Sequence, residues 1–414
     1  MASKLLAMQT APASTSFEKA QHEALTRSIS RPLLAGNQVD LLRDGSETFG
    51  AMFDAIAKAR DHINVASYII DDQGPGQEML KRLVARRRQG VRVNVAFDSA
   101  GCFNTSRSVF DALHHEGISL LEHNPLSHLK TWLGQAFQRR NHRKLMIVDG
   151  HTGFIGGLNI SGVYAGSAPV KKKKSSDDEF AKADWRDTHV RVQGPVVGQL
   201  QRLFIDQWQR HAGPGQQMPG PARYFPRPRA AGEQRAGLAA AECGPGHNDF
   251  YSALLAAVDA AHSQVCITTA YFVPPHRLLR ALVAAAQRGV DVQLMLPGRS
   301  DFWAPLHAGR WHFGQLLRAG VRIFERHDRL LHAKTAVIDG IWATVGSSNL
   351  DWRSLVHNAE ANLIVLDAPF AQQMEAMFRQ DVAQCREVSL HRWNGRAGLD
   401  KMKEWTARRF EFFL

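Results

Sequence analysis

The sequence predicts an α/β fold built from two homologous halves, each a mostly parallel or mixed sheet covered by helices. Three observations support this prediction. Helix-like and strand-like patterns alternate along the chain, the same order of patterns occurs twice, and a short polar motif of the first half returns in the second after 190 residues. We therefore expect a pseudo-dimer whose two motifs face each other across one cleft.

The elements of the two halves correspond in order. In the first half, residues 47–63 have the apolar spacing of an amphipathic helix, and the apolar run 64–70 is typical of a strand. A helix over 79–90 and a strand over 91–98 follow. The second half repeats this order, with helices expected over 248–264 and 278–289 and strands over 265–273 and 290–298.

A segment rich in proline and glycine, Gly213–Gly237, has the composition of a connector between the halves. Matching residues are 203 positions apart at Tyr68 and Tyr271 but 190 apart at the motif, as insertions in loops produce. The expected division of the chain is an N-terminal segment at 1–40, a first half at 41–212, a connector at 213–245, a second half at 246–385 and a C-terminal tail at 386–414.

The composition narrows the possible functions. The chain has 51 Lys and Arg against 39 Asp and Glu, so its net charge is +12, which predicts attraction to nucleic acid, an anionic lipid surface or a phosphorylated substrate. The four cysteines are scattered singly, so neither a disulfide framework nor a metal site is expected. Because no apolar run is long enough to span a bilayer, contact with a membrane is expected from the side.

The repeated motif pairs a histidine with a lysine two residues later. His142 and Lys144 occur in HRKLMIVD, and His332 and Lys334 occur in HAKTAVID. In a strand, residues two apart point the same way, so each imidazole and ammonium is expected to share one pocket. We expect His142 and Lys334 to lie in a solvent-accessible cleft. Duplication at constant spacing favours a shared site that cleaves phosphodiesters over a pair of solvated surface residues.

An aspartate ends each motif, at Asp149 and Asp339, and each is followed by glycine. By strand parity these aspartates lie on the face opposite the histidines. We expect them to anchor local structure, although they complete the motif and are counted with its catalytic residues.

Small residues and an asparagine follow each motif, in GFIGGLNIS and ATVGSSNLD. Gly156, Gly157, Gly346, Ser347 and Ser348 are expected to let backbone amides approach a tetrahedral oxyanion. Asn159 and Asn349 add neutral hydrogen-bond donors, which with the two lysines describe a phosphate-binding site.

A carboxylate also occurs in each half, at Asp187 and Glu360. Either is suited to accept the Nδ1 proton of the histidine of its own half and so fix the tautomer, leaving Nε2 free to attack or donate. Because Asp187 has the shorter side chain, it is expected to orient His142 through a water molecule or not at all.

The two motifs resemble the signature of the phospholipase D superfamily, HxKxxxxD followed by a GGxN or GSxN run. The flanking stretches RNHRKLMIVDG, FIGGLNIS, WRDTHVRVQGP, YFVPP, LPGRSD and ATVGSSNLDWRS look like those of bacterial cardiolipin synthases, especially the type without transmembrane helices. The similarity extends from Leu41 to Asp381. It implies that each half is a phospholipase D-like α/β/α sandwich.

The resemblance also implies a mechanism without a metal or other cofactor. One histidine attacks phosphorus to give a phosphohistidine, and the other protonates the departing alcohol and then deprotonates the incoming one. The sequence leaves open which is the nucleophile, and we favour His142. The implied catalytic residues are His142, Lys144, Asp149, His332, Lys334 and Asp339. The implied substrate-binding residues are Gly157, Asn159, Ser347 and Asn349.

For the whole protein, the resemblance implies transfer of a phosphatidyl group from one phosphatidylglycerol to another lipid, with release of glycerol. The expected partners are anionic phospholipids and a membrane surface contacted peripherally, on the cytoplasmic face of the bacterial inner membrane. A nucleic-acid partner is not expected, and the sequence does not indicate an oligomeric state.

Two segments combine aromatic and basic residues as a surface that contacts a bilayer does, with packing in the core as the alternative for each. The first contains Leu129, Lys130, Trp132, Leu133, Phe137, Arg139 and Arg140. The second contains Trp405, Arg408, Arg409, Phe410, Phe412 and Phe413. The run Lys171–Lys174 is expected to be a solvated loop or a contact with acidic head groups.

Three other functions use the same residues. A hydrolytic phospholipase would discharge the phosphohistidine with water, and a phosphodiesterase would act on nucleic acid, for which the basic charge is also suited. A membrane-binding protein that has lost catalysis is the third, and the intact reactive residues in both halves argue against it.

Overall fold

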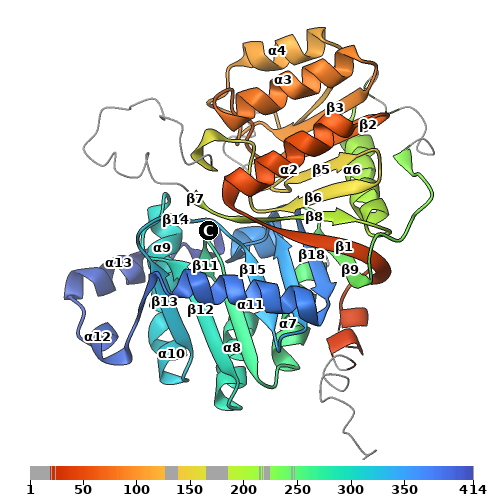
Figure 1. The fold of residues 1–414 in the computed structure, drawn as a ribbon. Helices are drawn as coiled ribbons and strands as arrows, with labels where there is room; N and C mark the ends of the chain where they lie inside the picture. The colour runs from red at the N-terminus through yellow and green to blue at the C-terminus, as the bar shows by residue number, and fades with distance from the viewer. Residues whose placement is uncertain are drawn as a thin grey trace, which may run out of the picture.

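The computed structural model of this chain describes residues 19, 21–23, 25–125, 139–164, 185–213, 216, 218, 224–243, 246 and 248–413. Within these residues, fifteen strands form one continuous sheet that runs through both halves (Figure 1). Their order is β19-β13-β12-β10-β15-β16-β18-β9-β1-β8-β6-β5-β2-β3-β4.

Among its described residues, the first half contributes seven strands to this sheet and four helices that cover it. The strands are β1 (Leu34–Arg43), β2 (His62–Ser67), β3 (Arg92–Asp98), β4 (Ser119–His123), β5 (Leu145–Val148), β6 (Thr152–Gly156) and β8 (Thr188–Gln193). The helices are α2 (Asp44–Lys58), α3 (Pro75–Arg88), α4 (Arg107–His115) and α6 (Val197–His211). The short strand β7 (Trp185–Arg186) lies outside the main sheet.

The second half contributes the other eight strands. They are β9 (Gln234–Ala241), β10 (Gln264–Thr268), β12 (Asp291–Pro297), β13 (Arg322–Arg326), β15 (Thr335–Ile338), β16 (Trp342–Gly346), β18 (Glu360–Leu366) and β19 (Cys385–Glu387). Its helices are α7 (Asp249–Asp259), α8 (His276–Gln287), α9 (Trp303–Trp311), α10 (Phe313–Arg318), α11 (Ala368–Val382), α12 (Leu390–Asn394) and α13 (Gly398–Arg408). Short strands β11 (Phe272–Val273), β14 (Leu330–Leu331) and β17 (Leu350–Asp351) lie beside the main sheet, and a π-helical turn covers Arg353–His357.

The two halves have the same strand order about the antiparallel pair β1 and β9. Outward from β1 the strands are β8, β6, β5, β2, β3 and β4, and outward from β9 they are β18, β16, β15, β10, β12 and β13. In the second half, β19 adds an antiparallel strand at the edge, beside β13. In each half three neighbouring strands are parallel, β2 with β3 and β4, and β10 with β12 and β13. This equivalence is the pseudo-dimer of two α/β halves that the sequence predicts.

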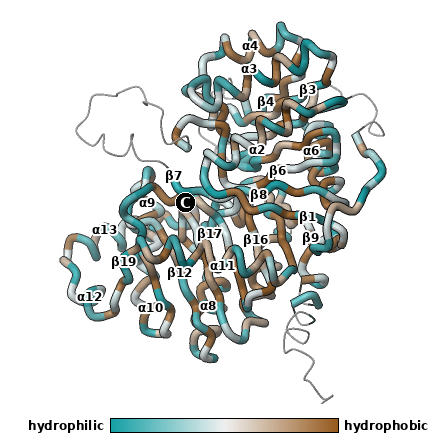
Figure 2. Tube along the Cα trace, viewed as in Figure 1, coloured by the Kyte–Doolittle hydropathy of each residue, from teal (hydrophilic) through white to brown (hydrophobic). Residues whose placement is uncertain are grey.

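Helices cover both faces of the sheet, and the described residues form three large apolar cores and one small one. Helices α6 and α11 pack with inward-facing residues of both halves in one shared core, whereas α2 to α4 and α7, α8 and α10 cover the opposite face of their own halves. Helix α9 packs with α13 and β11 in the small cluster. Strand alternation sorts the side chains: Ile147 enters the shared core, and Met146 and Val148 enter the core under α2 and α3. Figure 2 shows the hydrophobic residues concentrated along these strands.

Some segments differ from the expected division of the chain. Residues 234–241 of the expected connector form β9 at the centre of the sheet, paired with β1 and β18. Their apolar side chains allow this, because Ala236, Leu238 and Ala240 pack in the shared core and Ala239 packs in the core of the second half. In the N-terminal segment, Leu25 is buried in the core of the second half and Gln21 donates to the carbonyl of Ala257. The C-terminal tail contains most of β19 and all of α12 and α13. Lys171–Lys174 and the membrane-contact candidates Leu129 to Phe137 lie outside the described residues.

A buried ionic cluster joins the two halves near β7 and β14. The guanidinium of Arg186 donates to Asp381 at 2.6 Å and forms an ion pair with Asp44 at 3.3 Å. Arg326 forms a second ion pair with Asp381 at 3.0 Å, and Arg329 one with Asp44 at 2.8 Å. Arg43 adds a third ion pair with Asp381 at 3.5 Å, so the charge of this carboxylate, which is only 2% exposed, is compensated by Arg43, Arg186 and Arg326.

Replacement of Asp381 by alanine is expected to lower the free energy of unfolding by about 3–5 kcal/mol, because it leaves two buried guanidiniums without their shared carboxylate. Urea unfolding followed by circular dichroism measures the loss. The control is Asp400→Ala, which removes a half-exposed pair with Lys403 at 3.6 Å and should change stability by less than about 1 kcal/mol. Equal effects of the two substitutions would contradict the assigned role of the cluster.

Candidate active site

The two motifs lie at equivalent places in the sheet. His142 and Lys144 directly precede β5, and His332 and Lys334 directly precede β15, so they stand just outside the strands that the sequence analysis assigned to them. Leu145 at the start of β5 pairs with Ala66 near the end of β2. The motif therefore lies at the carboxyl ends of the parallel strands, where open α/β sheets bind their ligands.

Backbone bonds between the halves hold each motif in place. The amide of His142 donates to the carbonyl of Ala359 at 2.9 Å, directly before Glu360. In the equivalent arrangement, the amide of His332 donates to the carbonyl of Arg186 at 2.8 Å, directly before Asp187. Each motif is thus paired with the segment that carries the other half's carboxylate.

The side chain of each motif histidine is likewise paired with the carboxylate of the other half. Nδ1 of His142 lies 2.9 Å from Oε1 of Glu360, and Nδ1 of His332 lies 2.6 Å from Oδ2 of Asp187. The expected pairing within each half is therefore wrong: Asp187 bonds directly to His332, and Glu360 bonds to His142. The sequence could not show this, because the crossing depends on how the halves pack.

The electrostatics of these pairs leave both imidazoles neutral near pH 7. Burial, with the nearby lysines, lowers the pKa of His142 to about 4 against the opposing effect of Glu360. Burial and both lysines also hold the pKa of His332 well below its usual value. Burial would raise the pKa of Glu360, but His142 and Lys144 lower it, so an ionised carboxylate accepts the Nδ1 proton of His142. Burial raises the pKa of Asp187 to about 6.

The ammonium group of each motif lysine contacts the backbone of its own motif histidine. The ammonium of Lys144 donates to the carbonyl of His142 at 2.7 Å, and that of Lys334 donates to the carbonyl of His332. Both residues are 2% exposed, so the expectation that Lys334 lies in a solvent-accessible cleft is wrong. Burial lowers the pKa of Lys144 to about 7 and that of Lys334 to about 8. Their protonation is therefore sensitive to pH near neutrality.

The small residues after each motif make room for the carboxylates. A Cβ added to Gly157 would lie 2.1 Å from Oδ1 of Asp187. At the equivalent place, the hydroxyl of Ser347 is hydrogen-bonded to Glu360 and helps lower its pKa. The amides expected to face an oxyanion are engaged elsewhere, since that of Gly157 donates to Thr188 and that of Ser347 to Ala361, each at 3.0 Å. That expectation is therefore wrong for these two amides.

The two asparagines lie in one cavity with both histidines. Oδ1 of Asn159 accepts the amide of Ile69 at 3.2 Å, and its Nδ2 donates to the hydroxyl of Tyr164, which in turn lies 3.2 Å from Nδ1 of His332. Oδ1 of Asn349 has no hydrogen-bond partner among the described residues.

The motif aspartates lie at the opposite edge of the sheet. Asp149 has a left-handed backbone, and its carboxylate accepts the amides of residues 60, 61 and 62 at 2.8–2.9 Å, at the start of β2. Asp339 does the same at the start of β10. The four residues of β5 alone, at about 3.3 Å each, keep Asp149 far from His142. These contacts agree with a structural anchor.

The histidines of both motifs line one cavity of about 190 Å³. His142 and His332, which belong to different halves, both line it. The other lining residues are Tyr68, Ile69, Arg140, Asn159, Trp185, Tyr271, Asp301, Phe302, Asn349, Asp351, Arg353, Ser354 and Asn358. Among the lining residues that the structure describes, neither Asp149, Asp339, Gly157 nor Ser347 occurs.

Several of these residues have no signal in the sequence motifs. The ring of Tyr68 contacts His142 edge-on with centroids 5.2 Å apart, and Trp185 lies 5.2 Å from His332. The repeat itself aligns Tyr68 with Tyr271, which was the one available indication of their shared location. These rings restrict the positions that a substrate can take beside the imidazoles.

The cavity is asymmetric in charge. Asp301 and Asp351 both come from the second half, and each acts electrostatically on Lys334. Burial raises the pKa of Asp351 to about 6, and Oδ1 of Asp301 accepts the hydroxyl of Tyr271 at 2.8 Å. The end of the cavity near Lys334 therefore offers hydrogen-bond acceptors, which suit hydroxyl groups of a ligand.

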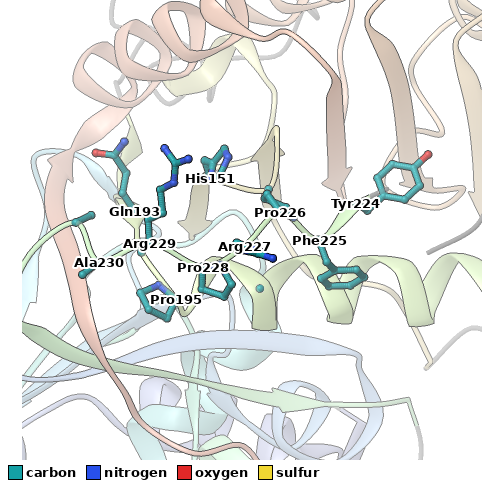
Figure 3. A pocket seen from close by; sticks show the side chains of 14 residues that line it. His151, Gln193, Pro195, Tyr224, Phe225, Pro226, Arg227, Pro228, Arg229 and Ala230 are labelled. Atoms are coloured by element: carbon teal, nitrogen blue, oxygen red, sulfur yellow. The ribbon is translucent and has the colours of Figure 1, made fainter. Parts of the chain in front are cut away.

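A larger cavity, of about 440 Å³, lies between the first half and the segment that precedes β9 (Figure 3). Residues 224–231 ahead of β9 form much of its wall, with His151 and Gln193 opposite them. It contains neither motif histidine, so its size alone does not make it the site of chemistry.

The comparison with known protein families agrees with this geometry. The model described as "Cardiolipin synthase, PLD-like domain" matches residues 52–164 and 254–382, which include both motifs. The chain belongs to this family. It is therefore a cardiolipin synthase-like phosphatidyltransferase of the phospholipase D superfamily.

Individual relatives cover most of the chain. Cardiolipin synthase 2 of Bacillus anthracis is 32% identical over 372 residues, 89% of this chain and 69% of the relative. Cardiolipin synthase A of Pseudomonas syringae pv. syringae is 34% identical over 372 residues, 89% of this chain and 73% of the relative. The crystal structure of phosphatidylserine synthase from Haemophilus influenzae shares the fold, with a TM-score of 0.69 at 13% identity over 95% of this chain and 100% of that one. None of the helices in the described ranges has the length and apolarity needed to cross a bilayer.

The crossed pairing predicts which histidine each carboxylate affects. Glu360→Gln should lower kcat for phospholipid turnover by about 10²–10⁴-fold, because an amide can stabilise the wrong tautomer of His142. In nitrogen-15 spectra of the imidazoles, this substitution should change the tautomer of His142 and leave His332 as it was. Asp187→Asn should do the reverse. If each substitution changed the histidine of its own half instead, the crossed arrangement would be refuted.

Proposed function

We propose that this protein makes cardiolipin from two molecules of phosphatidylglycerol, through a phosphohistidine, and releases glycerol. The observation that carries the proposal is that His142 and His332 line one cavity, each with Nδ1 bonded to a carboxylate. Since Nδ1 is engaged, Nε2 is the nitrogen of each ring that is free to react. Two such imidazoles suit a reaction with one nucleophile and one proton carrier.

In the first step, Nε2 of His142 attacks phosphorus and forms a P–N bond. The P–O bond to the glycerol head group breaks, and His332, whose protonated form is favoured by the bound phosphodiester anion, gives its proton to the departing glycerol oxygen. In the second step, a hydroxyl of another phosphatidylglycerol gives its proton to His332 and attacks phosphorus. The P–N bond then breaks, which frees His142 and yields cardiolipin.

The environments of the two histidines support this division of roles. Glu360 has a lowered pKa and keeps a proton on Nδ1 of His142, so Nε2 carries a lone pair for attack. His332 is paired with Asp187, whose raised pKa lets the pair take up a proton more readily. A bound phosphodiester anion also favours the imidazolium, since it lies beside the ring.

Lys144, Lys334, Asn159 and Asn349 would stabilise the charge of the five-coordinate transition state. The ammonium groups act electrostatically on both imidazoles, so they lie close enough to act on a phosphate between them. Asp301 and Asp351 would accept hydrogen bonds from the hydroxyls of a glycerol head group. This arrangement, and the names of the relatives, favour phosphatidylglycerol as donor and acceptor.

On this proposal, the partners are anionic phospholipids in a membrane that the protein contacts from the side. We further propose the cytoplasmic face of the bacterial inner membrane as its location. A metal or other cofactor takes no part in the proposed steps.

Incubation of the purified protein with phosphatidylglycerol vesicles tests the proposed reaction. Cardiolipin and glycerol should appear in equal amounts, and both His142→Ala and His332→Ala should abolish them. Acid-labile, base-stable phosphate should be trapped on His142 of His332→Ala, because this variant keeps the nucleophile.

Two other products would overturn the proposal. Phosphatidic acid without cardiolipin would make the protein a hydrolytic phospholipase D, and cleavage of single-stranded DNA without lipid turnover would make it a nucleic-acid phosphodiesterase. Cardiolipin formed equally well by His142→Ala would refute the covalent intermediate.

The buried titratable groups predict a bell-shaped pH profile for kcat/KM. Activity should rise as His142, with a pKa of about 4, loses its proton, and begin to fall as the His332–Asp187 pair, in which Asp187 has a pKa of about 6, loses the proton that the leaving group needs. It should fall further as Lys144 and Lys334 lose their protons at about 7 and about 8, because the neutral amines no longer stabilise a phosphate. Initial rates on a monomeric short-chain phosphatidylglycerol measure the profile. A rate that stays constant to pH 9.5 would contradict the assigned role of the lysines.

A further inference from the structure

Large hydrophobic side chains are exposed almost entirely in one region of the molecule. Of the nine found in the described part of the chain, eight lie on α9, on α13 or in the residues adjoining these helices. We call this region the aromatic face. It consists of Phe302, Trp303, Trp311, Leu399, Met402, Trp405, Phe410 and Phe412. Single exposed apolar residues are ordinary, but a gathering of this kind marks a binding surface.

Helix α13 presents its apolar residues outward. Leu399, Met402 and Trp405 are three residues apart, so they share one face of the helix, and they are 67%, 58% and 52% exposed. The side against the protein is formed by Ala407, which packs with Ala308 of α9, and by Glu404. A helix that only covers a core has the opposite arrangement, with its apolar stripe inward.

The residues after α13 extend the same surface. Phe410 is 58% exposed, and Phe412 is 49% exposed although its ring contacts Trp352 at 5.4 Å. Packing in the core, the alternative considered for Trp405, Phe410 and Phe412 in the sequence, is therefore wrong. In Figure 1, α13 lies at the outer edge of the second half beside α9.

Basic residues are interleaved with these rings. The guanidinium of Arg408 lies 4.9 Å from the ring of Trp311, and that of Arg409 lies 5.3 Å from the ring of Trp405. Lys401 and Lys403 are exposed on the same helix. The carboxylate of Glu404 is paired with Arg396, and that of Glu411 with His312. These two negative charges are therefore engaged by side chains of the protein itself. The face is therefore both apolar and positively charged.

The aromatic face adjoins the active site. Phe302 lines the catalytic cavity, and Trp303 directly after it begins α9. On the other side, Phe412 contacts Trp352, which directly follows the cavity residue Asp351. A surface held against the aromatic face would thus lie close to residues that line the catalytic cavity.

We propose that the aromatic face docks on an anionic phospholipid bilayer, with its rings among the head groups and its cations beside lipid phosphates. The choice of a bilayer rests on the proposed lipid substrate and on the combination of rings and positive charge. A second copy of the chain fits less well. In a twofold dimer the same face meets itself, which would place Lys401, Arg408 and Arg409 against their own copies.

Sedimentation with vesicles tests the proposal on the full chain. The wild type should bind phosphatidylcholine vesicles that contain 30 mol% phosphatidylglycerol, and bind pure phosphatidylcholine more weakly. Trp405→Ser combined with Phe410→Ser should weaken binding by about tenfold or more, because two aromatic side chains no longer enter the interface. Arg408→Gln combined with Arg409→Gln should weaken binding to the anionic vesicles alone, and reduce its dependence on salt.

The matched control for charge is Arg227→Gln combined with Arg229→Gln, which removes two exposed arginines of residues 224–231, away from the aromatic face. It should bind vesicles like the wild type. Urea unfolding establishes that each variant is folded. Turnover of monomeric short-chain phosphatidylglycerol should be the same in the Trp405 and Phe410 variant as in the wild type, while turnover in vesicles falls by about tenfold.

The remaining outcomes separate this proposal from the proposed reaction. Vesicle binding by the wild type without any lipid turnover would overturn the reaction and leave the docking surface supported. Absence of vesicle binding, or equal binding by all folded variants, would overturn the docking surface. If the wild type is a dimer that the Trp405 and Phe410 substitutions dissociate without changing vesicle binding, the face is an interface between copies and the proposal is wrong.

Discussion

Two hydrogen bonds that cross between the halves, from His142 to Glu360 and from His332 to Asp187, determine the arrangement of the site. Each histidine receives its backbone position and its tautomer from the opposite half. The continuous sheet, the shared core under α6 and α11 and the ionic cluster around Asp381 keep those halves in fixed register. A shift of about 1 Å between them would weaken both pairs at once, since a good hydrogen bond has little tolerance in length.

Burial gives these groups their chemistry. The same removal from water keeps the imidazoles neutral, brings the pKa values of the lysines toward neutrality and raises that of Asp187. Burying these charged groups costs free energy, and each is compensated by a partner from another segment. The cavity therefore holds a strong field that is already oriented before substrate arrives, which is the condition for stabilising a transition state rather than a ground state.

The sequence predicted the two-half architecture, because both the order of elements and the motif spacing repeat. It also indicated the residues that meet in the cavity, His142, His332, Asn159 and Asn349, because their pattern is local. What it missed depends on packing between distant segments: the partner of each carboxylate, the burial of Lys334, and β9 within the apparent connector. The role of Gly157 was missed for the same reason, since the neighbour that needs its missing side chain is Asp187, thirty residues away.

The crossed pairs also have a consequence for how the protein is made. His142 is synthesised 218 residues before the carboxylate that orients it. While the ribosome is still adding the second half, the early histidine has neither its acceptor nor its partner imidazole. A truncated or half-translated chain thus carries His142 without the carboxylate that orients it, and the site is assembled only after Glu360 and the segments around it have been synthesised.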